Sequence, residues 1–68
     1  MQHLGAVVRR RRLALCLSQE QLAERVPCNR NYVGMIERGE HNPTTTKLRG
    51  FATALNTTVS SLTRSAGI

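Results

Sequence analysis

The chain has 68 residues, enough for one domain, and a domain of this size buries only about 60% of the surface that its unfolded form exposes. Hydrophobic residues make up 40% of the sequence and charged residues 21%, a balance that excludes the fibrous and disordered classes of protein. Ten Lys and Arg against four Asp and Glu give a net charge of +6 at pH 7, which favours a polyanionic partner, either nucleic acid or an anionic membrane surface.

The apolar runs GAVV and LALCL are far shorter than the roughly 20 residues of a membrane-spanning helix. A signal peptide is not expected either, because the arginine run follows the short apolar stretch instead of preceding a longer one. Cys16 and Cys28 are twelve positions apart without a Cys-x-x-Cys motif, and His3 and His41 are distant from both. We therefore expect a cytoplasmic protein with reduced cysteines and without a membrane partner, a metal or another cofactor.

Helical spacing of the hydrophobic residues predicts five short helices and no strand, and hence an all-α fold. The first helix is expected at about residues 4 to 15, with Leu4, Val7 and Val8 on its inner face and most of the following arginines on the other faces. In the second helix Ser18 is the predicted N-cap, and Gln21 three residues later completes a capping box.

Pro27 disfavours helical angles in the residue before it, so the second helix is expected to end near Arg25. The third helix is predicted at about residues 30 to 38, with Asn29 as its N-cap. The two remaining helices are predicted at about residues 45 to 55 and, with Ser60 as N-cap, at about residues 60 to 64.

The second and third helices have the form of a helix-turn-helix. They are short, a turn of about four residues joins them, and the small Ala23 stands where they approach each other. In this motif the start of the second of the two helices enters the major groove of DNA, where its side chains hydrogen-bond to bases and phosphates. Asn29, Arg30 and Asn31 are side chains suited to those bonds.

At these residues the chain resembles the Cro and repressor (XRE-like) family of phage and bacterial DNA-binding domains. The resemblance rests on LSQEQLAERV, NYVGMIERGEHNP and LRGFATALN, and it covers about residues 4 to 63. Within the family the chain is most similar to the controller proteins of restriction-modification systems. The resemblance implies a compact repressor-like domain formed by residues 1–68, in a cytoplasmic, nucleoid-associated protein of a bacterium or phage.

Carried over by position, the base-reading residues of the family fall on Arg30 and Asn31, with Met35 one turn further along the same face. The fork of the Arg30 guanidinium matches the acceptors of guanine, and such a bidentate contact gives about 1–3 kcal/mol of discrimination against the wrong base. Three roles stay open for Asn31: it reads adenine, binds a phosphate or only caps the helix.

The resemblance also implies contacts with the sugar-phosphate backbone of DNA. Gln19 begins the second helix, where free backbone N–H groups favour a phosphate. Tyr32 either binds a phosphate through its hydroxyl or simply packs. The remaining candidates for backbone contacts are Asn29, Arg38, His41, Asn42 and Thr45.

Arg12 and Glu37 match a pair that bridges the first and third helices in the family, so we expect a structural ion pair here and not a DNA contact. Glu20 and Glu24 share one face of the second helix. The matching carboxylates of some repressors contact RNA polymerase; the alternative is that Glu20 suits the positive start of the helix and that Glu24 is solvated. Pro27 departs from the family, which usually has a residue tolerant of positive φ at this position, so the turn is expected to be shaped differently.

Helix-turn-helix proteins commonly bind two half-sites about one DNA turn apart, so we expect a homodimer on a palindromic operator. We expect no effector-binding domain and no small-molecule ligand, because little sequence follows the fifth helix. The dimer surface is then expected to use Val59, Leu62 and Ile68, the apolar residues left over from the core.

The predicted function is a sequence-specific transcriptional regulator that binds double-stranded DNA, as a restriction-modification controller of its own gene and of the endonuclease gene. The alternatives are a phage Cro-like or repressor-like protein and an antitoxin that represses its own operon. RNA binding is disfavoured by the scarcity of aromatic residues, and a membrane-active peptide by the short, capped helices. The sequence also offers no convincing catalytic set, so we expect no enzyme.

Overall fold

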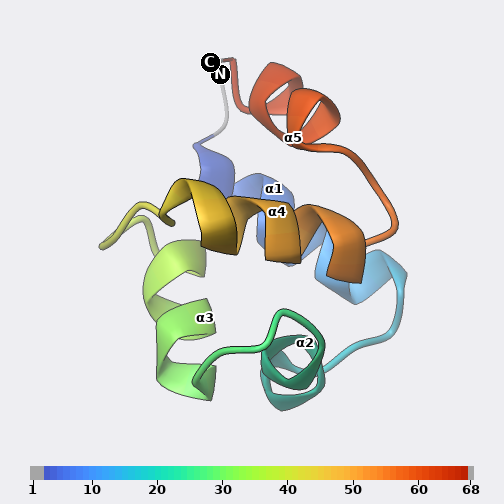
Figure 1. The fold of residues 1–68 in the computed structure, drawn as a ribbon, viewed down its shortest axis with the longest axis vertical. Helices are drawn as coiled ribbons and strands as arrows, with labels where there is room; N and C mark the ends of the chain where they lie inside the picture. Colours follow the sequence, from blue (N-terminus) through green and yellow to red (C-terminus); the bar gives the residue numbers. More distant parts are fainter. Residues whose placement is uncertain (1–2, 68) are drawn as a thin grey trace.

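The computed structural model describes residues 3–67, and these residues form five α-helices and no strand. In chain order the helices are α1 (Leu4–Ala14), α2 (Gln19–Arg25), α3 (Arg30–Glu37), α4 (Thr45–Ala54) and α5 (Val59–Ser65). The predicted all-α fold is confirmed for this part of the chain. In Figure 1, α4 crosses over α1, while α2 and α3 lie together at one end of the molecule and α5 lies at the other.

The capping residues predicted for α2 and α3 are present. The Gln21 backbone N–H donates to the Ser18 hydroxyl at 3.0 Å, and the Ser18 N–H donates to the Gln21 side-chain oxygen at 2.8 Å, so the capping box is complete. The Asn29 side chain accepts a hydrogen bond from the N–H of Asn31 at 2.7 Å. These bonds satisfy N–H groups that a helix start leaves without an intrahelical partner.

The predicted start of the last helix is wrong. α5 begins at Val59, and its N-cap is Thr58, whose hydroxyl accepts a hydrogen bond from the N–H of Ser61 at 3.0 Å. Ser60 therefore lies inside the first turn of the helix. Thr58 has the extended backbone that an N-cap requires, with φ −115° and ψ 157°.

The turn between α2 and α3 contains Pro27, and the Val26–Pro27 peptide bond is cis. Residues 26–29 include no positive φ angle, so this turn differs from one built on a glycine, as the sequence predicted. The Lys47 ammonium donates to the Pro27 carbonyl oxygen at 2.7 Å, which links the turn to the start of α4.

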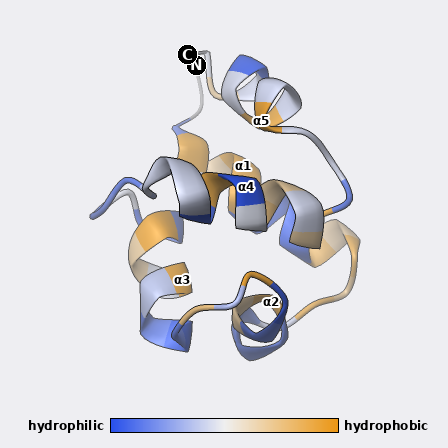
Figure 2. Cartoon of the chain, in the orientation of Figure 1, coloured by the Kyte–Doolittle hydropathy of each residue, from blue (hydrophilic) through white to orange (hydrophobic). Residues whose placement is uncertain are grey.

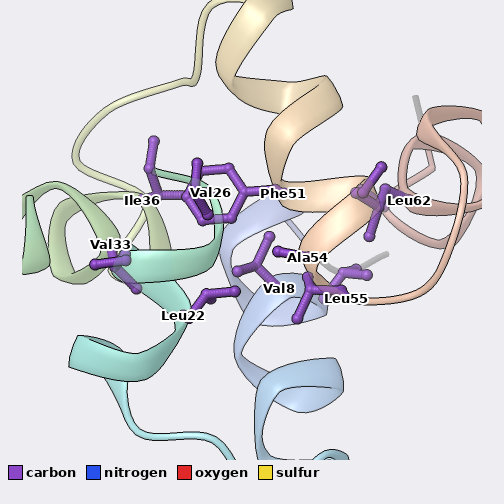
Figure 3. Close-up of a cluster of buried hydrophobic side chains, with 13 residues drawn as sticks. Val8, Leu22, Val26, Val33, Ile36, Phe51, Ala54, Leu55 and Leu62 are labelled. Carbon is purple, nitrogen blue, oxygen red and sulfur yellow. The ribbon is translucent and has the colours of Figure 1, made fainter. Parts of the chain in front are cut away.

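The hydrophobic core receives side chains from every helix of the described chain, as Figure 3 shows. The largest completely or almost completely buried members are Phe51, Leu22, Ile36, Leu62, Val7, Val8 and Val33. Leu62 has no exposed surface within one chain, so its predicted place in a dimer interface is wrong. A side chain that already fills the core cannot also contact a partner subunit.

Two glycines allow the helices to pack closely. A Cβ atom at Gly5 of α1 would collide with the backbone carbonyl oxygens of Ile36 and Glu37 at the end of α3. A Cβ atom at Gly50 of α4 would lie 2.6 Å from the Val26 carbonyl oxygen at the end of α2. Helices α1 and α4 therefore fix the positions of the two helices of the helix-turn-helix.

Within residues 3–67, none of the helices has the length and apolar character needed to span a membrane.

Candidate nucleic-acid interface

Helices α2 and α3 pack against each other and leave a polar surface outside. Ala23 of α2 is buried, and its carbonyl oxygen accepts a hydrogen bond from the Cys28 N–H at 2.7 Å. Val33 and Ile36 are buried on the inner side of α3, while Arg30 and Asn31 are exposed at its start. Figure 2 shows that hydrophilic residues dominate α2 and the first turn of α3.

The three predicted base-reading residues lie along α3. Arg30 is the first residue of the helix, its side chain is 58% exposed, and its Nε atom is 3.8 Å from the carboxylate of Glu20 on α2. Asn31 is exposed, whereas Met35 is half-buried one turn further along. The structure thus presents a guanidinium and an amide together at one helix start, which is the arrangement that base-edge readout uses.

A buried ion pair joins α3 to α1. Arg12 Nε donates to Glu37 Oε2 at 2.7 Å and Arg12 Nη2 donates to Glu37 Oε1 at 3.1 Å, with side-chain exposures of 9% and 3%. Arg12 Nη1 also donates to the Leu17 carbonyl oxygen at 2.8 Å. The predicted structural pair is therefore present, and both partners are hydrogen-bonded as buried charges require.

Gln19 is connected to the same pair. It is the first residue of α2, and its side-chain nitrogen donates to Glu37 Oε1 at 3.2 Å. The Glu37 carboxylate, itself part of α3, therefore holds side chains from two other segments, α1 and the start of α2. The sequence patterns contained no signal for the Gln19 contact.

The structure does not support the predicted phosphate contact of Tyr32. The Tyr32 hydroxyl is buried and has no hydrogen-bond partner among the described residues. The ring stacks on Phe51 at a centroid distance of 6.3 Å and meets His41 edge-on at 5.6 Å. Of the two alternatives for Tyr32, packing is the one that the structure favours.

The predicted backbone-contacting residues that follow α3 lie close together. Arg38, His41 and Asn42 line a pocket of about 290 Å³ together with residues from the start of α1, among them His3. Arg38 is bound bidentately by Glu40, with nitrogen–oxygen distances of 2.7 and 3.2 Å, and both side chains are exposed. This bond raises the pKa of Arg38 and holds the pKa of Glu40 below its ordinary value. Any DNA contact of Arg38 thus competes with Glu40, a residue that the sequence analysis did not single out.

The other residues considered for chemistry are dispersed. Thr45 is exposed as the first residue of α4. Cys16 is exposed and Cys28 is partly buried, both are free thiols, and burial raises the pKa of Cys28. The described residues contain no group of three or more side chains placed to hold a metal ion.

A model of the helix-turn-helix domain family matches residues 3–64. The chain belongs to this family. Helix-turn-helix domains act by binding DNA and not by catalysis, so membership places the chain in a non-enzymatic class. Control protein C.SmaI of Serratia marcescens is 48% identical over 52 residues, which are 76% of this chain and 62% of that protein. The chain therefore spans less than two thirds of the length of this relative.

Two solved structures match this helix-turn-helix chain over most of both lengths. The restriction-modification controller protein C.AhdI from Aeromonas hydrophila superposes with a TM-score of 0.84 at 39% identity, over 87% of this chain and 89% of that one. The P22 c2 repressor, in complex with a synthetic operator, superposes with a TM-score of 0.88 at 27% identity, over 91% and 94%. The resemblance to Cro and repressor domains, and to controller proteins in particular, is confirmed.

Proposed function

We propose that this protein is a sequence-specific, double-stranded-DNA-binding transcriptional regulator and a restriction-modification controller. The observation that carries the proposal is the exposed pair Arg30 and Asn31 at the start of α3, the second helix of the helix-turn-helix. The similarity to C.SmaI and to C.AhdI supports the controller assignment. As such a regulator the protein acts in the cytoplasm on its own gene and on the endonuclease gene.

In the proposed complex α3 enters the major groove. Arg30 donates two hydrogen bonds to the acceptors of one guanine, and Asn31 meets the next base or phosphate. The net charge of +6 draws the protein to the phosphates and adds affinity that does not depend on sequence. The buried Arg12–Glu37 pair acts indirectly, because it fixes α3 and the Gln19 side chain to the body of the domain.

We also propose that the chain binds its operator as a homodimer through one domain formed by residues 1–68. Two half-sites about one helical turn apart require two recognition helices in a fixed relation. Val59 is half-buried against the core and keeps part of its surface for a partner, whereas Ile68 lies outside the described residues. No small-molecule ligand is needed for this activity.

The test is selection of duplexes from a randomised DNA pool at about physiological salt. We expect enrichment of a pseudo-palindrome with half-sites about one turn apart, and its occurrence upstream of the protein's own gene. The Arg30→Ala variant should lose discrimination at one base pair of each half-site. Salt-sensitive binding without any enriched sequence would overturn the proposal.

A repressor without a controller role is the second candidate, and the match to the P22 c2 repressor favours it. The same selection separates the two, since a controller should find its operator beside an endonuclease gene. A phage repressor or an antitoxin should find it beside phage genes or within a toxin operon.

Activation through RNA polymerase is a further part of the proposal, and it concerns the exposed carboxylates of α2. Glu24 is the residue to test, because Glu20 is within 3.8 Å of Arg30 and its charge reversal would disturb DNA binding as well. Glu24→Lys should abolish activation of transcription in vitro while the variant still binds the operator in preference to other sequences. Activation that survives the change would exclude this contact.

A further inference from the structure

The exposed surface of the helix-turn-helix carries one ion pair that joins its two helices. Glu20 is in the first turn of α2, Arg30 is the first residue of α3, and the Glu20 carboxylate is 3.8 Å from Arg30 Nε. The side chains are 75% and 58% exposed. The carboxylate thus stands beside the guanidinium on the same face that offers Arg30 to DNA.

We propose that Glu20 is a specificity-determining residue that makes the DNA contact of Arg30 conditional on guanine. This inference rests on the proposed function, since it concerns the same interface. A free guanidinium binds any phosphate oxygen and so adds affinity for every sequence. A carboxylate within reach competes with those phosphates for the same N–H donors.

The competition distinguishes the two kinds of DNA contact. A single phosphate contact replaces one anionic acceptor by another and gains little over the Glu20 pair. A guanine accepts two parallel hydrogen bonds from the fork, and this contact favours the correct base by about 5- to 150-fold. Glu20 therefore lowers the affinity for wrong sequences more than the affinity for the operator.

The chain supplies a matched control on the same helix. Glu24 lies one turn beyond Glu20, is also a glutamate and is exposed, but among the described residues no ion pair joins it to an arginine or lysine. Glu20→Gln and Glu24→Gln each remove one negative charge and keep the side-chain size. Any difference between them reports the contact with Arg30 and not the change in net charge.

The experiment measures the dissociation constants of the wild type and of both variants at one salt concentration. Three duplexes are compared: the selected operator, the operator with the Arg30-read base pair inverted, and an unrelated sequence. We expect Glu20→Gln to tighten binding of the two wrong duplexes about 1.4- to 5-fold more than Glu24→Gln does, which is the range measured for exposed ion pairs. The discrimination at the inverted base pair should fall, because the affinity for the operator rises less than the affinity for the inverted duplex.

The same comparison in an Arg30→Ala background tests whether Glu20 changes the DNA affinity through Arg30. Without the guanidinium, Glu20→Gln and Glu24→Gln should change all three affinities equally. Equal effects of the two variants on the wild-type background, or a difference that persists without Arg30, would overturn the inference while the proposed function stands. A wild type that prefers no duplex would overturn the proposed function itself, and this inference with it.

Discussion

At the scale of single residues, the Glu37 carboxylate connects three helices. It accepts hydrogen bonds from Arg12 of α1 and Gln19 of α2 while it is itself part of α3. The ion pair was predictable, because a family pattern places both charges. The contacts of Gln19, Tyr32 and Arg38 were not, because side-chain torsions and close neighbours decide them and neither follows from spacing along a helix.

Removing one partner of this pair should destabilise the fold strongly. Glu37→Gln leaves the Arg12 guanidinium buried without its counter-ion, and we expect a loss of about 3–5 kcal/mol in the free energy of unfolding, measured by urea denaturation. Glu40→Gln is the control, since it breaks the exposed Arg38–Glu40 pair and should leave stability nearly unchanged. Similar losses in both variants would contradict a special role for the buried pair.

The two cysteines should react at different rates. Burial raises the pKa of Cys28, so less of its thiol is ionised at neutral pH, and its side chain is less accessible than that of Cys16. We expect iodoacetamide to label Cys16 first in the folded protein, as followed by mass spectrometry of digested samples. The rate at Cys28 should rise steeply at alkaline pH as its thiol ionises. In urea the two rates should become alike, and a preference that remains there would point to local sequence instead of burial.

At the scale of helices, caps decided how well the sequence predicted the structure. α2 and α3 each have one clear N-cap, Ser18 and Asn29, and their starts were predicted correctly. Before α5 the stretch TTVSS offers several hydroxyl side chains that can cap, so the pattern alone did not fix the start. In the structure α5 begins at Val59, whose side chain packs against the core.

The capping box should contribute measurably to stability. Ser18→Ala removes the acceptor of the Gln21 N–H, and we expect a loss of about 1 kcal/mol in the free energy of unfolding. Ser60→Ala is the matched control, since this serine is not the cap of α5 and the change should cost less. A larger loss from Ser60→Ala would indicate that Ser60, and not Thr58, is the N-cap of α5 in solution.

Two glycines in helices should respond oppositely to the same substitution. A methyl group at Gly5 meets the backbone of α3, so Gly5→Ala should force α1 away and cost about 1–3 kcal/mol. At Gly34 the nearest atom is Nη1 of the flexible Arg38 side chain at 2.9 Å, so Gly34→Ala should stabilise α3 by up to about 1 kcal/mol. Thermal unfolding of the two variants tests the contrast, and a stable Gly5→Ala protein would mean that α1 and α3 do not approach this closely.

At the scale of the whole molecule, charge and shape combine in the proposed activity. The helices of residues 3–67 share one core, and the net charge of +6 of the chain is carried on its surface apart from the buried Arg12 and Glu37. We expect the affinity for DNA to fall about 10³-fold or more between 50 and 200 mM salt if a dimer contacts six or more phosphates. Arg30→Ala should lower discrimination while it changes the salt dependence only slightly. A salt-independent affinity would exclude phosphate contacts as the main source of binding.

The place of α5 in the core has a consequence for synthesis of the protein. Leu62 and Ala66 are buried, and α5 packs against α1 and α4, so α5 covers one side of the hydrophobic core. During translation the helix-turn-helix leaves the ribosome well before these side chains do. Until residue 66 has emerged, the side chains of α1 and α4 that contact α5 stay exposed to solvent. The domain therefore cannot reach its stable packed state before then. A nascent chain is therefore expected to gain DNA-binding ability only after its synthesis has passed α5.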